Sequence, residues 1–313
     1  MNRPSPFTHV AIVGPGAIGL VLAARLGRAP GGPQVTLIDH RPDRAARLSG
    51  RPIVLHGPEG DLETSVPVRL APEAPPDLVI LATKAYAARA AAAHAPWIGR
   101  TPVLLMQNGL GVAAEVAQVL PQSPLVTAVS YQAANLAAEG EVRHVANLVT
   151  LVGYEGRPPD ATARAIAAML SAAGLPARTA DDMSPEVWAK LLVNAAINPV
   201  AALAGVANGE VAERPSLRAL AQAIAEEGEA AARAVGVALP YPSAVEAAID
   251  TARRTADNRC SMLQDLEARR PTEIEYLNGA IVRAAEPRGV ATPANRAISA
   301  LVRQVSGQKG AGR

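Results

Sequence analysis

With 313 residues, of which 49% are hydrophobic and 19% charged, the chain can bury a substantial core, which excludes a disordered protein and favours two domains of ordinary size. The net charge of +2, without a basic run, excludes the electrostatic pattern of a nucleic-acid-binding protein. The sequence also lacks the window of about 20 uninterrupted apolar residues that would predict a membrane span. The single cysteine, Cys260, cannot form an intramolecular disulfide, so we expect a cytoplasmic protein.

The first half of the sequence alternates short apolar runs with alanine-rich segments. Such alternation is typical of a doubly wound, parallel Rossmann-type sheet with helices between its strands. Predicted strands are His9–Val13, Val35–Asp39, Leu78–Thr83, Pro102–Met106 and Leu125–Val129, with a hairpin over Arg51–Val66, a pair or edge strand over Val142–Val152 and a short strand near 176–180. Predicted helices are Ala17–Arg28 and the segments near 85–95, 111–119 and 160–173.

From Ser184 onward the strand-like runs stop and alanine-rich helical segments follow one another. We expect helices near 184–204, 215–236, 242–256, 272–286 and 293–306. The fold class is therefore α/β, with a Rossmann-type NAD(P)-binding domain over residues 1–181 and an all-α domain over residues 182–313. Ser184-Pro185 is a plausible start for the second domain, because proline is favoured at the first position of a helix.

A glycine-rich turn follows the first predicted strand and opens the first predicted helix. This G-x-G-x-x-G sequence supplies a tight turn, a close backbone approach to a pyrophosphate and close packing of helix on strand. The amino end of the helix then faces the phosphate charge. The predicted dinucleotide-binding residues of this turn are Gly14, Pro15, Gly16, Ala17, Ile18 and Gly19.

The choice between NADH and NADPH is left open at the end of the second predicted strand. Asp39 lies 20 residues past Gly19, where an acidic side chain typically binds the ribose 2′-hydroxyl of NADH. His40, Arg41 and Arg44 follow, and a basic residue there can bind the 2′-phosphate of NADPH. The two arginines are equally compatible with a solvated helix start.

One predicted helix of the second domain carries polar residues at regular intervals. Lys190, Asn194 and Asn198 are spaced i, i+4, i+8, so they share one face of an otherwise apolar helix. The chain has only three lysines, Lys84, Lys190 and Lys309, and a desolvated lysine can release a proton where an arginine cannot. The alternative is a set of internal hydrogen bonds that satisfy the helix.

The other ionisable residues narrow the chemistry further. All five histidines lie in the first half, with no Cys/His cluster at metal-ligand spacing, so we expect no metal site. A second polar cluster follows at Ser261–Asp265 and Arg270–Gly279. Thr272–Glu275 is also compatible with a capped helix start that has acidic residues in its first turn.

Taken together, these motifs resemble the ketopantoate reductase (2-dehydropantoate 2-reductase) family. The matching segments occur in the family's order over nearly the whole chain, so the resemblance is more specific than a dinucleotide fingerprint. They are GPGAIG at 14–19, TKAY at 83–86, QNGLG at 107–111, WAKLLVNAAINP at 188–199, ANGE at 207–210, SMLQD at 261–265 and TEIEYLNG at 272–279.

The resemblance implies a helical domain like that of 6-phosphogluconate dehydrogenase and NADPH-dependent reduction of 2-dehydropantoate to (R)-pantoate, on the route to pantothenate and coenzyme A. It implies that Lys190 is the general acid and that Glu273 positions the substrate beside the coenzyme. Further substrate contacts implied by the family pattern are Asn108, Asn194, Asn198, Asn208 and Ser261. On the coenzyme side it implies roles for Lys84, Asn108, Glu273 and the residues Asp39, His40 and Arg41.

One departure from the family pattern concerns the coenzyme. Family members commonly place arginine where His40 stands, so NADPH is expected and NADH use remains open because of Asp39. Two other functions stay open: a reductase of the same architecture for another small 2-oxo acid, and a non-catalytic nucleotide-binding sensor. We expect a small-molecule substrate, no nucleic-acid or membrane partner, and a homodimer as one assembly that the sequence allows.

Overall fold

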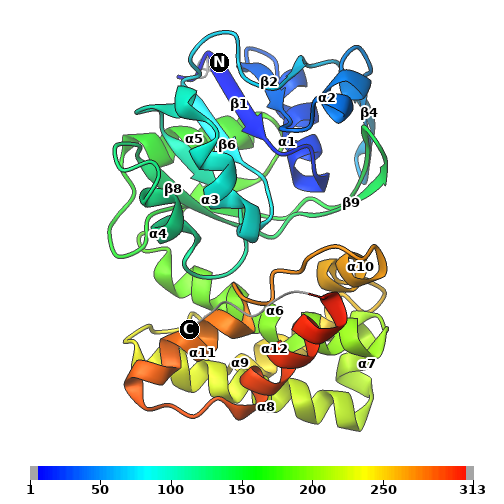
Figure 1. Cartoon of the computed structure of the whole chain (residues 1–313), viewed down its shortest axis with the longest axis vertical. Helices are drawn as coiled ribbons and strands as arrows, with labels where there is room; N and C mark the ends of the chain where they lie inside the picture. Colours follow the sequence, from blue (N-terminus) through cyan, green and yellow to red (C-terminus); the bar gives the residue numbers. More distant parts are fainter. Residues whose placement is uncertain (1–5, 308–313) are drawn as a thin grey trace. The chain divides into compact units, whose positions relative to one another are not determined.

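A computed structural model describes residues 6–307, and these divide into two compact units (Figure 1). The sheet unit contains the chain up to Gln107 together with Val112–Met183. The helical unit contains Asn108–Gly111 together with the chain from Ser184 onward. The short loop Asn108–Gly111, which connects a strand to a helix of the sheet unit, therefore groups with the helical unit, although both of its neighbours along the chain belong to the sheet unit.

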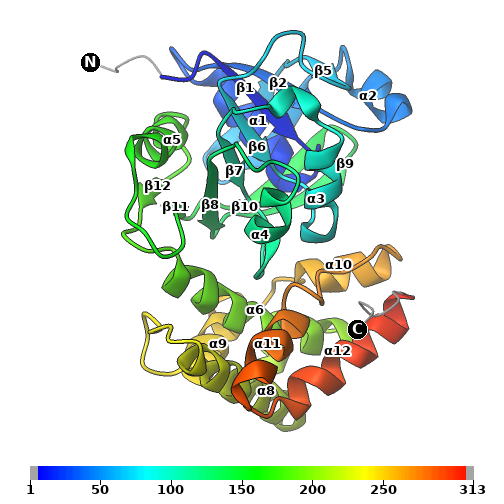
Figure 2. The same cartoon turned by 60° about the vertical axis from the view of Figure 1, so that its left-hand side comes forward.

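The sheet unit is built on an eight-stranded sheet in the order β12-β11-β8-β7-β6-β1-β2-β5 (Figure 2). From β5 to β8 all neighbouring strands are parallel, β11 is antiparallel to β8, and β12 is parallel to β11. The predicted parallel-dominated sheet is confirmed. Its strands are β1 (His9–Val13), β2 (Gln34–Ile38), β5 (Val68–Arg69), β6 (Leu78–Leu81), β7 (Val103–Leu105), β8 (Leu125–Ser130), β11 (Thr150–Gly153) and β12 (Ala177–Thr179).

A second, four-stranded sheet covers one helix of this unit, and the predicted strand segments include three of its strands but not β9 (Ala133–Ala138). The expected hairpin forms β3 (Ile53–Gly57) and β4 (Gly60–Thr64), which join β10 (Glu141–Ala146) and β9 (Ala133–Ala138) in the order β4-β3-β10-β9. Helix α1 contacts β1 and β2 as well as all four strands of this second sheet. Burial on both sides explains why apolar residues dominate its sequence.

The remaining helices of the sheet unit follow its strands, with the long hydrophobic side chains of β1, β6 and β7 fully buried between them. Four of the five α-helices in this unit were predicted. Helix α2 was missed because three of its seven residues are charged and few are apolar. The helices are α1 (Ala17–Arg28), α2 (Pro42–Leu48), α3 (Ala85–Ala93), α4 (Val112–Ala117) and α5 (Ala161–Ala172), with a 3₁₀ turn η1 at Pro96–Ile98.

The helical unit is organised around α6, which packs most extensively against α7, α8, α9, α10 and α12. This helix is long and apolar enough to cross a membrane by length and composition, but most of its apolar stretch is buried inside the protein. The helices are α6 (Ser184–Ala204), α7 (Asn208–Glu213), α8 (Pro215–Ala234), α9 (Ala244–Arg254), α10 (Ser261–Glu267), α11 (Asn278–Ala285), η2 (Glu286–Arg288) and α12 (Pro293–Ser306).

The predicted helix at 272–286 is wrong in its first third. Helix α11 begins only at Asn278, and the segment before it is a series of turns closed by backbone bonds from Tyr276 and Leu277 to the Glu273 carbonyl. The Tyr276 carbonyl accepts a bond from the Leu110 N–H at 3.0 Å, so it is committed to a partner outside its own segment. This tertiary contact outweighs local helix propensity.

Candidate active site

The glycine turn between β1 and α1 has steric requirements at two of its glycines. Gly14 has φ of +106°, which side chains rarely adopt, and a Cβ there would lie 3.0 Å from Thr83 Cγ2. A Cβ at Gly19 would collide with the Gly14 carbonyl oxygen. The first and third glycines therefore fix the turn itself and the packing of α1 on it.

The second glycine, Gly16, has a different environment. No atom lies within 4 Å of the position a Cβ would take, so Gly16 faces open space. It is also the N-cap of α1, which has no side-chain cap and no acidic residue in its first turn. Uncapped amide groups at the start of a 12-residue helix, next to open space, fit the pyrophosphate of a dinucleotide.

At the end of β2, the Asp39 carboxylate has partners within its own unit. Its side chain is fully buried, and both oxygens bond to the Arg44 guanidinium, which approaches through Nε and, at 2.8 Å, through Nη2. The Arg41 N–H adds a bond at 3.1 Å. Burial raises the pKa of Asp39, but the bonds from Arg44 and Arg41 outweigh it and hold this pKa below the ordinary value.

The two other predicted residues of this turn, His40 and Arg41, are exposed at the start of α2. The His40 ring lies 3.7 Å from the Asp39 carboxylate, while the Arg41 side chain extends from the N-cap position. Lys84 is half-buried at the N-cap of α3, directly after β6. Strands β2, β1 and β6 are parallel neighbours, so these residues follow the same edge of the sheet.

Sequence reasoning missed two polar atoms at this edge. The hydroxyl oxygen of Thr83 and Oε1 of Gln107 are buried and have no hydrogen-bond partner within residues 6–307. The only sequence signal was their place, since each stands two residues past the end of a buried strand.

In the helical unit, α6 presents Lys190, Asn194 and Asn198 as half-buried residues between fully buried neighbours. Burial lowers the pKa of Lys190 from 10.5 to about 8, and the negative charge of Glu273 acts in the opposite direction. Glu273 is itself only 7% exposed. The two ionisable groups predicted to be catalytic therefore influence each other electrostatically, and the lysine can exchange a proton close to neutral pH.

Three contacts hold the other predicted residues close to α6. The Cys260 thiol, next to Ser261, donates to the Asn198 carbonyl at 3.4 Å. Asn278 Nδ2 donates to the Ala195 carbonyl at 3.1 Å and so fastens the segment that contains Glu273. Ser261 is exposed at the first position of α10, which packs on α6.

Asn208, at the start of α7, is held by its backbone N–H, which donates to the Asn258 carbonyl at 3.0 Å. Its Nδ2 donates to the Thr255 hydroxyl at 2.9 Å, while its Oδ1 is buried without a partner among the described residues. The nitrogen of this amide therefore has a structural role, whereas its oxygen has no hydrogen-bond partner within residues 6–307.

The loop Asn108–Gly111 is attached to the turns around Glu273. Leu110 donates its N–H to the Tyr276 carbonyl and packs on the core of the helical unit. Gly109 lies against the same tyrosine, with φ of +97°. Asn108, half-buried, is thereby placed next to a loop residue that contacts the segment containing Glu273.

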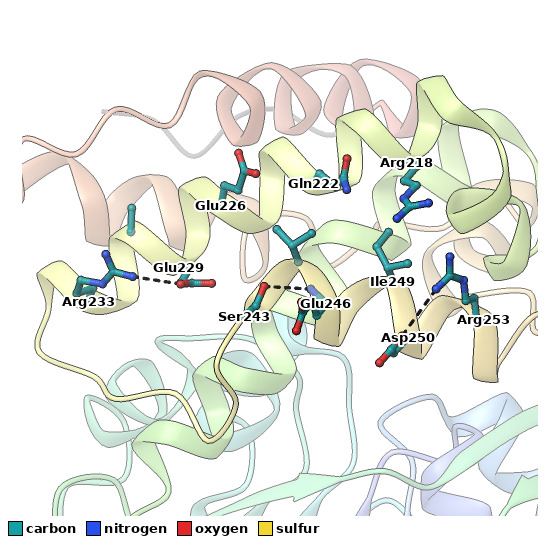
Figure 3. Close-up of a pocket in the computed structure, with 12 residues that line it drawn as sticks. Arg218, Gln222, Glu226, Glu229, Arg233, Ser243, Glu246, Ile249, Asp250 and Arg253 are labelled. Carbon is teal, nitrogen blue, oxygen red and sulfur yellow. Dashed lines mark hydrogen bonds and ion pairs between the residues drawn. The ribbon is translucent and has the colours of Figure 1, made fainter.

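A charged groove lies between α8 and α9 (Figure 3). Its walls carry both signs of charge, and Arg233 is paired with Glu229 and Arg253 with Asp250. None of the predicted site residues lines it. No group of three metal-ligating side chains occurs within residues 6–307 either.

Comparison with known proteins gives one consistent family. Residues 10–156 match the model described as ketopantoate reductase PanE/ApbA, and residues 182–306 match the model of its C-terminal domain. The chain is 34% identical to a 2-dehydropantoate 2-reductase of Halobacterium salinarum over 94% of its length and 98% of the relative's. It is 33% identical to that of Mycobacterium tuberculosis, with 96% and 98% covered.

Solved structures agree with this relationship. A PanE/ApbA family ketopantoate reductase from Ralstonia eutropha superimposes with a TM-score of 0.86 at 32% identity, covering 96% of this chain and 98% of that one. A D-mandelate dehydrogenase solved with NADH and anilino(oxo)acetate gives a TM-score of 0.87 at 25% identity, with 96% and 98% covered.

We predict that Gly109→Ala destabilises the protein more than Gly111→Ala. Both glycines have positive φ (+97° and +90°), so both substitutions introduce backbone strain of about 1 kcal/mol or more. Only at position 109 would the new Cβ meet another segment, 2.7 Å from the Tyr276 carbonyl carbon, whereas nothing lies within 4 Å at position 111. Urea denaturation of both variants measures the difference, and equal losses would contradict the packing of this loop on Tyr276.

Proposed function

The chain belongs to the ketopantoate reductase family, and on that premise we propose that it reduces 2-dehydropantoate to (R)-pantoate with NADPH as hydride donor and Lys190 as general acid. It is an oxidoreductase of the family's kind, and its product leads to pantothenate and coenzyme A. The observation that carries the proposal is a half-buried lysine whose pKa is lowered to about 8 and which interacts with the charge of Glu273.

Reduction of a ketone requires a proton at the carbonyl oxygen as negative charge develops there. When bound, the reduced nicotinamide supplies the hydride. Lys190 supplies the proton, because an acid with a pKa of about 8 is mostly protonated at neutral pH and is still a ready donor. Glu273 has a balancing effect: its negative charge opposes the loss of the proton that burial favours, so the ammonium persists until it is needed.

The asparagines around Lys190 suit the polar groups of a small hydroxylated 2-oxo acid. Asn194 and Asn198 share its helix face, and the buried Oδ1 of Asn208 is an unused acceptor. We propose that these amides and the Ser261 hydroxyl form hydrogen bonds with substrate oxygens. Glu273 accepts a hydrogen bond from the substrate hydroxyl, and Asn108 contacts both the nicotinamide and the substrate.

We predict that Lys190→Met lowers kcat by about 10²-fold or more, the usual contribution of a general acid. In the unaltered enzyme kcat should fall as pH rises through about 8, because the reactive form is the protonated one. The variant should be at least as stable at pH 7, since its folded state no longer holds a cation whose pKa burial depresses. Turnover that is unchanged would remove Lys190 from the mechanism, and thermal unfolding checks that the loss is not unfolding.

For the coenzyme we propose NADPH, because the structure leaves Asp39 little ability to repel a 2′-phosphate. Its carboxylate is buried and neutralised by Arg44, so it acts as a positioning residue for the start of α2. His40 and Arg41, exposed beside it, can supply positive charge and hydrogen bonds to the phosphate. The buried pair thus explains how an aspartate that is typical of NADH enzymes is compatible with NADPH.

We predict that Arg41→Ala lowers kcat/KM for NADPH by about tenfold while changing kcat/KM for NADH less than twofold, since a lost charge-assisted bond affects only the phosphorylated coenzyme. Arg28→Ala, an exposed arginine at the far end of α1, is the matched control and should change neither. Equal losses with both coenzymes would show that Arg41 does not contact the 2′-phosphate.

A second candidate function is reduction of another 2-oxo acid, favoured by the likeness to a D-mandelate dehydrogenase solved with NADH. We predict that kcat/KM for 2-dehydropantoate exceeds that for pyruvate and for phenylglyoxylate by at least about tenfold, because the polar amides around Lys190 need a hydroxylated partner. Steady-state rates with each acid and both coenzymes measure this. A preference for phenylglyoxylate would replace the first candidate by the second, and no turnover with any acid would favour a nucleotide sensor.

The cytoplasmic location and the homodimer stay predictions.

A further inference from the structure

We propose that Thr83 and Gln107 bind the nicotinamide-riboside half of the coenzyme, with Thr83 Oγ1 and Gln107 Oε1 as hydrogen-bonding atoms. The inference rests on the proposed function, because it takes the glycine turn after β1 as the coenzyme site. It concerns two residues of the sheet unit that none of the predicted roles includes.

The topology places both residues on the coenzyme side of the sheet. Strands β1, β6 and β7 are adjacent and parallel, Thr83 follows β6 and Gln107 follows β7. Thr83 also touches the glycine turn, since its Cγ2 and N lie 3.0 and 3.1 Å from where a Gly14 Cβ would be. With the adenosine end at Asp39 after β2, a dinucleotide that crosses the glycine turn must extend its other half toward β6 and β7.

The orientation of the Gln107 amide is settled by its partners. Nε2 donates to the Leu81 carbonyl at 2.8 Å and to the Thr83 carbonyl at 3.1 Å. Both partners can only accept, so the nitrogen must face them and Oε1 must face the other way. Gln107 therefore fixes the turn after β6 with one end of its amide and presents an acceptor with the other.

That acceptor and the neighbouring hydroxyl are both unused. Thr83 Oγ1 and Gln107 Oε1 are buried and lack a partner among residues 6–307. A buried polar atom without a hydrogen bond is costly and is rare in folded proteins, so two of them on residues that are hydrogen-bonded to each other call for a ligand. The hydroxyls of the nicotinamide ribose and the NH₂ of the carboxamide are the donors that a dinucleotide brings to this edge.

The test uses Thr83→Val, which keeps the shape of the side chain and removes only the unpartnered hydroxyl. Isothermal titration calorimetry of the full chain with NADP⁺ should show binding weakened at least about fivefold, the effect of one lost hydrogen bond. Binding of 2′,5′-ADP, which lacks the nicotinamide riboside, should be unchanged, and the melting temperature without ligand should not fall. Thr83→Ser should restore much of the affinity.

A third ligand, 2′-phospho-ADP-ribose, separates the two donors. Weakened binding of this compound assigns the contact to the ribose, and weakened binding of NADP⁺ alone assigns it to the carboxamide. Equal weakening for 2′,5′-ADP, or no weakening for NADP⁺, would overturn the proposal. If the unaltered chain binds neither these three ligands nor NAD⁺, the glycine turn is not a coenzyme site and the proposed function fails with it.

Discussion

The burial of one ammonium group on α6 is the constraint on which the rest of the structure depends. Desolvation alone would drive Lys190 toward its neutral form, and a nearby carboxylate alone would hold it charged. Glu273 stands in the turns that precede α11, not in a regular helix. The Asn278 side chain, bonded to the Ala195 carbonyl, fastens those turns to the helix that carries the lysine.

At the proposed coenzyme site, the important constraint is how much space surrounds each glycine of the turn between β1 and α1. Glycine is required at positions 14 and 19 because a Cβ there would be too close to other atoms. At Gly16 an added Cβ would meet nothing within 4 Å. Next to this turn the charge of Asp39 is cancelled by Arg44 inside the protein. Three features, namely an uncapped helix, a neutralised aspartate and the exposed Arg41, all make the same edge of the sheet favourable for phosphate.

Much of the fold was predictable because its signals are local. Strand β1 and helices α1 and α6 have the bounds that their apolar patterns indicate, and the turn at Gly57–Gly60 marks a real hairpin. In the second sheet the sequence missed one strand, β9, because its sequence AANLAA lacks the β-branched and aromatic residues of typical strands. Short helices such as α7 and α10 lie below the length at which periodicity can be read.

The site was harder to predict where its geometry depends on distant partners. Asp39 and Arg44 are only five residues apart, yet the sequence does not show that they pair. It is equally compatible with an Asp39 that binds a ribose while Arg41 and Arg44 are exposed to solvent. In the segment QNGLG, Gln107 bonds to the turn after β6 while Leu110 bonds to Tyr276, so residues only three positions apart have partners in different units. Two glycines with positive φ let the backbone meet both demands within five residues. The residue types of the QNGLG motif are therefore explained by contacts in both units. The contacts of Gln107 in the sheet unit explain only its first residue, and those of Leu110 in the helical unit explain only its later residues.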